Sequence, residues 1–309
     1  MIKKYREFIF EDESGSSTDY TDPTEYTDDN SFKTRFEKFK EFLHKKSAGS
    51  SSSSSSTPSV DSEPKQYTSG SSSFGDVDKM ISIVVKYLNK HGITNPIVQK
   101  AILATIGKES GFTATKEASY KTTSPARIRG VFGSRFSGLS DEEINKIKQN
   151  DAEFWERSYG GEWGKKNLGN TQPGDGAKYI GRGFNGITGR KNYQTYSDLL
   201  KKAGTNVDLI SNPEILEKNP EISAEVNALY FLRGLSDPII KRKYGNSGAN
   251  DFKDFETALK AVVNTNAGSG NDITRGFPKQ SYDAAVAANN KLGSKFDRAI
   301  SSDTESRTA

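Results

Sequence analysis

The chain has 309 residues, of which 32% are hydrophobic, and a formal net charge of +4. It contains no cysteine and two histidines, which excludes disulfides, thiol catalysis and cysteine-based metal sites and disfavours multi-histidine ones. No apolar run approaches the ~20 residues of a membrane-spanning helix, and the N-terminus lacks the apolar core of a secretory signal. We therefore expect synthesis in a reducing cytoplasm, no metal or cofactor, no transmembrane segment, and acid–base chemistry from carboxylates.

Residues 1–73 are predicted to be a disordered, low-complexity extension. Its first 30 residues carry a net charge of −6, whereas residues 31–46 carry +4 and place four phenylalanines on one stripe of a short amphipathic helix. Residues 47–73 include the serine run 50–56 and form a flexible linker. The helix is marginal alone and is expected to dock on a protein partner, with a lipid surface or its own domain as alternatives.

The folded domain is expected over residues 74–300. Asp76 is positioned to cap a first helix, and Asn95 followed by Pro96 begins a second one that ends at Gly111. Glu109 lies in the last turn of this largely apolar helix. Both the helix dipole and partial burial there disfavour a carboxylate, and so favour the protonated form that a general acid needs. The alternative is an ordinary surface glutamate.

Glu117 follows eight residues later, close enough for both carboxyl groups to face one groove. One protonated and one ionised carboxyl group form the usual pair for cleaving a glycosidic bond. Two glutamates at this spacing also occur by chance, so the pair is one observation among several.

The centre of the chain is the glycine-rich stretch at residues 179–193, which holds four glycines and two arginines. Glycine suits backbone that bends sharply or approaches a ligand closely, so we interpret the stretch as the floor of a substrate groove. A surface hairpin is the alternative. Before it, Ser140 and Glu143 match a capping box, and residues 160–178 are expected to be an ordered loop or a short hairpin.

After the central stretch, helices are predicted at residues 193–203, 221–233, 252–263 and 281–299. A loop is expected at residues 264–271, and a polar tail at 301–309. The pattern has no alternating strand–helix units, so it predicts a mainly α fold with a small β element near residues 176–190.

Two adjoining segments resemble the signature of glycoside hydrolase family 19, which includes chitinases and phage endolysins. These are Leu168-Gly-Asn-Thr-Gln-Pro-Gly-Asp-Gly176 and the stretch that begins Tyr179-Ile-Gly-Arg-Gly-Phe-Asn-Gly. The segments around Glu109, the Asn212-Pro213 pair, and the loop from Asn266 to Arg275 are also similar to that family. The resemblance covers about residues 76–299 and implies an α+β, lysozyme-like fold.

The resemblance also implies roles for particular residues. Glu109 matches the general acid, Glu117 the general base, and Thr188 the hydroxyl that helps to hold the attacking water. The implied reaction is inverting hydrolysis of a β-1,4 bond. Groove or supporting positions correspond to Tyr179, Arg182, Asn185, Asn266 and Arg275. The usual second glycine after the acid is missing, because Gly111 is followed directly by Phe112.

Three functions follow as hypotheses. The first is an endolysin or virion-associated lysin that acts on the peptidoglycan of the bacterial wall, which the endolysin-like loop and the absence of cysteine favour. The second is a chitinase, and the third is a catalytically weak structural or wall-binding protein of the same fold. The opening residues 5–9 are similar to the start of internal head proteins of T-even-type phages, which suggests a virion partner for residues 1–46. No nucleic-acid partner is expected.

Overall fold

The computed structural model describes residues 76–113 and 115–308. The predicted helix at 31–46, the serine linker and the segment assigned to a virion partner lie outside these residues. The described chain is mainly α, as the sequence predicts, with one small antiparallel sheet. None of its helices combines the length and apolar character needed to cross a membrane.

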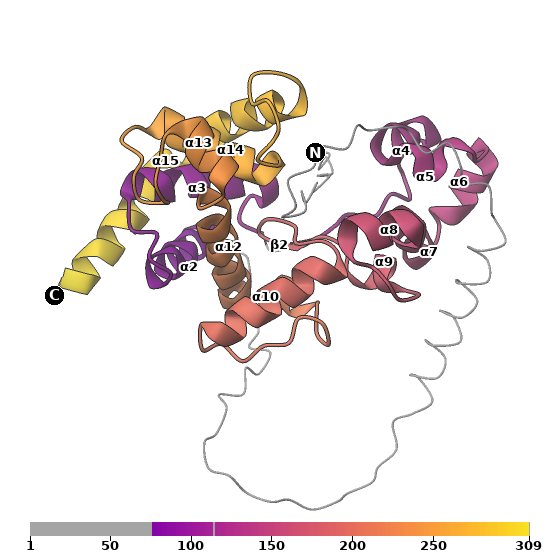
Figure 1. Ribbon diagram of the computed structural model, residues 1–309, viewed down its shortest axis with the longest axis horizontal. Coiled ribbons are helices and arrows are strands. Elements are labelled where there is room, and N and C mark those ends of the chain that lie inside the picture. Colours follow the sequence, from indigo (N-terminus) through magenta and orange to yellow (C-terminus); the bar gives the residue numbers. More distant parts are fainter. Residues whose placement is uncertain (1–75, 114, 309) are drawn as a thin grey trace, which may run out of the picture.

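The helices are arranged in two groups, with the strand β2 (Arg182–Gly183) between them in the view of Figure 1. One group includes the consecutive helices α4 to α9, and the other contains α2, α3 and the helices that follow β2. The bounds of the helices are α2 Val77–Lys90, α3 Pro96–Ser110, α4 Pro125–Phe132, α5 Ser134–Ser137, α6 Asp141–Ile147, α7 Asp151–Tyr159, α8 Gly161–Leu168, α9 Asp175–Lys178, α10 Arg190–Lys202, α11 Ile215–Lys218, α12 Pro220–Leu235, α13 Pro238–Tyr244, α14 Phe255–Ala267 and α15 Gly276–Thr308.

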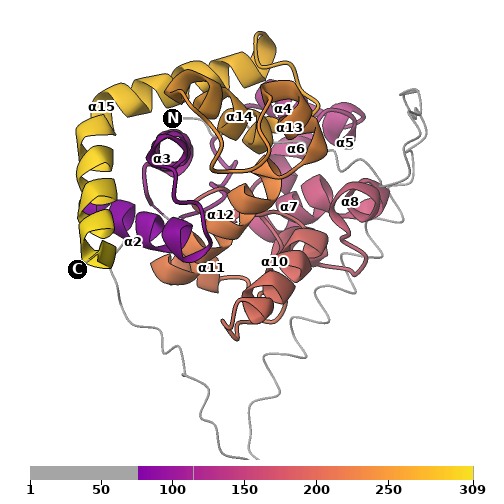
Figure 2. The ribbon, with the colours of Figure 1, turned by 60° about the vertical axis from the view of Figure 1, so that its left-hand side comes forward.

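The larger core surrounds α3. Asn95 caps this helix by accepting from the amide of Ile97, and Pro96 occupies its first turn, as predicted. Its middle is buried nearly all round, from Val98 to Ile106. Both α14 and α15 pack against it, and Figure 2 shows α15 extending past α3 and alongside α2. The C-terminal end of α3, which carries Glu109, is therefore fixed by surrounding helices.

The smaller core is aromatic and is formed by α4 to α8 and the segments beside them. Its aromatic rings pack closely against one another. The ring centroid of Phe154 lies 4.9 Å from that of Trp155, in an edge-on arrangement, and 5.0 Å from that of Tyr120, in a stacked one. The capping box of Ser140 and Glu143 at the start of α6 is confirmed. The main aromatic members are Tyr120, Phe132, Phe136, Phe154, Trp155 and Tyr159.

The β element joins the two groups. Strand β1 (Thr115–Lys116) pairs antiparallel with β2, with Thr115 opposite Gly183 and Lys116 opposite Arg182. A further bridge pairs Arg182 with Ile187. The predicted β element near 176–190 is thus confirmed. Its partner strand at 115–116 was not predicted.

Three segments differ from the sequence prediction. Residues 160–178 form the helices α8 and α9 rather than only a loop or hairpin, and Gly169 ends α8 in the left-handed region. Helix α14 continues to Ala267, through residues predicted as loop, because burial of Asn264 and its neighbours outweighs their weak helix propensity. Helix α15 extends through most of the segment assigned to a polar tail.

Candidate functional site

Glu109 projects from the last turn of α3, as the sequence predicts. Its side chain is 20% exposed and accepts a hydrogen bond of 2.9 Å at Oε1 from the Nδ2 amide of Asn266. Asn266 is almost fully buried in the last turn of α14. The neighbouring Lys108 forms an ion pair with the same carboxylate oxygen. The Glu109 carboxyl group is therefore held by two fixed helices.

Glu117 directly follows β1 and is tied to the residue before β2. Its backbone amide donates to the carbonyl of Gly181 at 2.8 Å, and the amide of Gly181 donates back to its Oε2 at 3.2 Å. The hydroxyl of Tyr159 donates to its Oε1 at 2.9 Å. Both carboxylate oxygens thus accept hydrogen bonds, which stabilise the ionised form.

Tyr159 is well suited to be this donor. It is buried in α7 and stacks on Trp155, with ring centroids 5.6 Å apart and planes inclined by 6°. Burial raises the pKa of Tyr159 well above its ordinary value, so the hydroxyl keeps its proton at physiological pH. The smaller aromatic core therefore supplies a fixed hydrogen-bond donor to Glu117.

Thr188 lies beside Glu117 across Gly181. A Cβ atom placed on Gly181 would be 3.2 Å from Glu117 Oε2 and 3.2 Å from Thr188 Oγ1, so both oxygens face the same backbone position. Thr188 Oγ1 donates to the carbonyl of Gly186 at 2.9 Å, which leaves its lone pairs available as acceptors. The carboxylate and the hydroxyl are placed to share a small polar ligand such as water.

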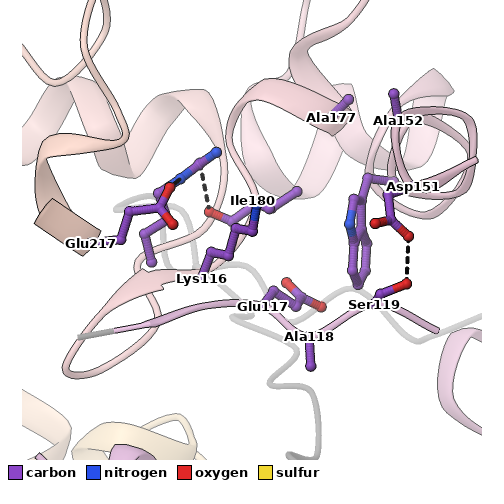
Figure 3. Close-up of a pocket in the computed structure, with 11 residues that line it drawn as sticks. Lys116, Glu117, Ala118, Ser119, Asp151, Ala152, Ala177, Ile180 and Glu217 are labelled. Carbon is purple, nitrogen blue, oxygen red and sulfur yellow. Dashed lines mark hydrogen bonds and ion pairs between the residues drawn. The ribbon is translucent and has the colours of Figure 1, made fainter. Parts of the chain in front are cut away.

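A pocket of about 580 Å³ opens beside Glu117, within the size range of small-molecule sites. Figure 3 shows Glu117 between Lys116 and the pair in which Ser119 donates to Asp151 at 2.6 Å. On another side, Arg182 donates to Glu217 at 3.0 Å. Glu109 is not among the residues that line this pocket, which include Trp155, Ala177 and Ile180.

Of the other predicted site residues, Tyr179, Arg182 and Asn185 are buried in the central stretch, whereas Arg275 is exposed. Tyr179 is fully buried with its hydroxyl on the carbonyl of Ile210, and Arg182 clamps the central stretch through the carbonyl of Lys178 and the hydroxyl of Tyr193. Asn185 is buried in the turn after β2. Arg275 is different: its side chain is 83% exposed and pairs with Asp272 at 2.9 Å. The structure therefore groups Glu109 with Asn266, and Glu117 with Thr188, but leaves Arg275 in solvent.

Polar residues of the central signature are largely structural. Asp175 is buried and receives two hydrogen bonds from the guanidinium of Arg190, at 2.7 Å and 2.5 Å. Asn170 links the amide of Arg190 to the carbonyl of Tyr159, at 2.8 Å each. This network fixes the stretch that carries Gly181 and Thr188 against the helix that carries Tyr159.

Lys108 and Tyr159 were not predicted from the sequence as residues of the site. The position of Lys108 next to a candidate acid is only a weak signal, because adjacent residues on a helix point in different directions. Tyr159 has no such signal, because its position four residues after Trp155 on a helix is typical of a core residue.

No protein-family model matches the chain, and no curated protein matches it as a relative. The residues and their geometry are therefore the basis for inferring a function. In the described part of the chain, no group of three or more histidine, aspartate or glutamate side chains is arranged to hold a metal ion. The site can be described in terms of its carboxyl, hydroxyl and amide groups.

Proposed function

We propose that this protein is a glycoside hydrolase that cleaves β-1,4 bonds of bacterial peptidoglycan with inversion. The observation that carries the proposal is the arrangement of Glu117 and Thr188 around Gly181. A carboxylate and a hydroxyl facing one small gap are what positioning and deprotonating a water molecule requires. The similarity of the central stretch to the family 19 signature adds the second carboxyl group, Glu109.

In this mechanism Glu109 acts as the general acid. Its proton passes to the glycosidic oxygen as the bond from that oxygen to the anomeric carbon breaks. A water molecule attacks the anomeric carbon from the opposite face, and Glu117 takes one proton from it. One water is consumed, both sugar products are released, and a proton exchange with solvent restores the two carboxyl groups.

The surroundings of the two carboxyl groups support different roles. Glu117 accepts hydrogen bonds on both oxygens from Gly181 and Tyr159, which favours the ionised state that a base needs. Glu109 lies at the C-terminal end of α3, where the helix dipole favours the neutral acid, whereas its ion pair with Lys108 favours release of the proton to the leaving group. Glu109 and Glu117 precede and follow β1, which makes a short connection between the acid and the base.

The test is hydrolysis of purified peptidoglycan by Glu109→Gln and Glu117→Gln variants. Each amide keeps the side-chain shape but cannot exchange the required proton, so we expect activity to fall by about 10²- to 10⁴-fold. Glu142→Gln is the matched control, because Glu142 is an exposed glutamate in the first turn of α6. Full activity in a folded Glu109→Gln variant would remove the proposed acid.

Colloidal chitin assayed in parallel distinguishes the two polysaccharides. Release of products from chitin but not from peptidoglycan would make the protein a chitinase. Turnover of neither, with retained binding to one, would indicate a wall-binding or structural protein.

We further propose that residues 1–73 deliver the enzyme to its place of action, through a virion protein that binds residues 1–46. The sequence pattern of this extension is the support, because it combines a phenylalanine stripe with a serine-rich linker. Deletion of residues 1–73 is expected to leave hydrolysis of purified wall unchanged and to remove the protein from purified particles. Equal particle content with and without the segment would contradict this proposal.

A further inference from the structure

Lys108 connects the candidate acid to the last helix of the chain. Its ammonium group pairs with Glu109 Oε1 and also donates to the hydroxyl of Ser281 on α15. The Lys108 side chain is 10% exposed, and Ser281 is 5% exposed. The Lys108 ammonium group thus has two fixed partners and is largely shielded from water, unlike the lysines that move freely on a protein surface.

We propose that Lys108 is a positioning residue that fixes the Glu109 carboxyl group and sets the upper pH limit of its action as an acid. The inference rests on the proposed function, since it concerns the proton that Glu109 would donate. It identifies a residue that the family resemblance does not assign.

Lys108 is a cation in direct contact with the Glu109 carboxylate. From α14 the neutral amide of Asn266 contacts Glu109, and on α15 the hydroxyl of Ser281 accepts from Lys108. Several other charged groups on the adjoining elements form ion pairs with one another rather than with Glu109. These pairs are Lys260–Glu256, Lys279–Asp283, Arg275–Asp272, Lys100–Asp297 and Lys295–Asp78.

The consequence for catalysis follows from charge. When Glu109 gives its proton to the glycosidic oxygen it becomes a carboxylate, and the adjacent ammonium group stabilises that product state. The same attraction promotes loss of the proton to solvent, so the acid is depleted at lower pH than it would be without Lys108. Lys108 thus makes Glu109 a stronger acid and narrows the pH range in which it is protonated.

The experiment measures kcat/KM for solubilised peptidoglycan against pH, in the full-length chain. Lys108→Met removes the charge, and we expect the alkaline limb of the profile to move upward by about one pH unit. Lys108→Arg keeps the charge and is expected to hold the limb within a few tenths of a unit of the wild-type position. A merely structural role for Lys108 would lower activity at every pH without moving this limb.

Lys100→Met is the matched control. Lys100 also lies on α3 and also connects to α15, through Asp297 at 2.8 Å, but it does not contact Glu109. We expect its profile to coincide with wild type. An unchanged alkaline limb in folded Lys108→Met, or an equal movement in Lys100→Met, would overturn the proposal.

Lys108→Gln provides a second neutral variant if the methionine variant does not fold, and the same outcomes apply to it. Glu109→Gln is assayed alongside to separate the two proposals. If Glu109→Gln keeps full activity, the proposed function fails at its acid. If Glu109→Gln is inactive while neither neutral Lys108 variant moves the limb, only the role of Lys108 is rejected.

Discussion

Replacing Tyr159 with phenylalanine is the sharpest test of how Glu117, the proposed base, is kept ionised. The substitution removes one hydroxyl and keeps the ring that stacks on Trp155. The lost group donates to Glu117 Oε1 at 2.9 Å. Glu117 would retain the amide of Gly181 on its other oxygen, at 3.2 Å.

The size of the effect follows from the charge of the acceptor. A hydrogen bond to an ionised group contributes about 1.5–3 kcal/mol, and each pH unit corresponds to about 1.4 kcal/mol. Loss of the bond destabilises the ionised base relative to its protonated form. The acid limb of the activity profile is therefore expected to move upward by about one to two pH units. Activity above neutral pH should change much less.

The assay is the initial rate of peptidoglycan hydrolysis across pH 4–9, with thermal unfolding measured on the same samples. Because the buried ring stays in place, the variant should remain folded. Tyr87→Phe is the control, since its hydroxyl donates at 3.2 Å to Glu221, away from the site. An unmoved acid limb in a folded Tyr159→Phe variant would refute the assignment of Glu117 as a base prepared by this bond.

Three further outcomes are expected. Gly181→Ala should lower the rate of hydrolysis with little change in melting temperature, because the added methyl group would lie 3.2 Å from both Glu117 Oε2 and Thr188 Oγ1. A wild-type rate of hydrolysis would contradict this prediction. Asn227→Leu should stabilise the fold by about 1–3 kcal/mol, because both polar atoms of this fully buried side chain lack a hydrogen-bond partner among the residues that the structure describes. A lower melting temperature would count against this prediction. Burial opposes ionisation of Glu225, but hydrogen bonds from His91, Lys90 and Thr205 outweigh burial and lower the pKa of Glu225. The free energy of unfolding should therefore fall as pH drops below about 4.5, and it should fall less steeply in Glu225→Gln. Parallel acid unfolding curves for the two proteins would exclude this prediction.

Much of the helical framework was predictable because local chemistry determines it. Asp76 and Asn95 cap the first two described helices, and the prolines at residues 96 and 220 lie in helix first turns, all as sequence rules imply. The two-residue strand β1 was not predictable, because nothing in the sequence of Thr115 and Lys116 distinguishes a strand from a loop. Its pairing with β2 depends on backbone groups more than 60 residues away.

The two candidate carboxyl groups could be chosen from the sequence, whereas the side chains that donate hydrogen bonds to them could not. Glu109 and Glu117 could be identified from position and resemblance, but the donors that hold them come from α7 and α14. Such contacts depend on how distant helices pack. Arg275 shows the limit of the resemblance, since the residue type matches while its side chain is exposed and pairs with Asp272.

Phe112 stands where the family 19 motif, which this segment resembles, would have a second glycine after the acid. Gly111 has φ 58° and Phe112 has φ 62°, so both residues lie in the left-handed region. A glycine at position 112 would adopt this conformation without strain. This conformation costs a phenylalanine about 1–2 kcal/mol. Its ring is fully buried, with its centroid 5.8 Å from that of Phe296 on α15, and burial of such a side chain contributes about 1.5–3 kcal/mol. Burial therefore offsets the strain, and the sharp turn after Glu109 leads directly into β1 and Glu117.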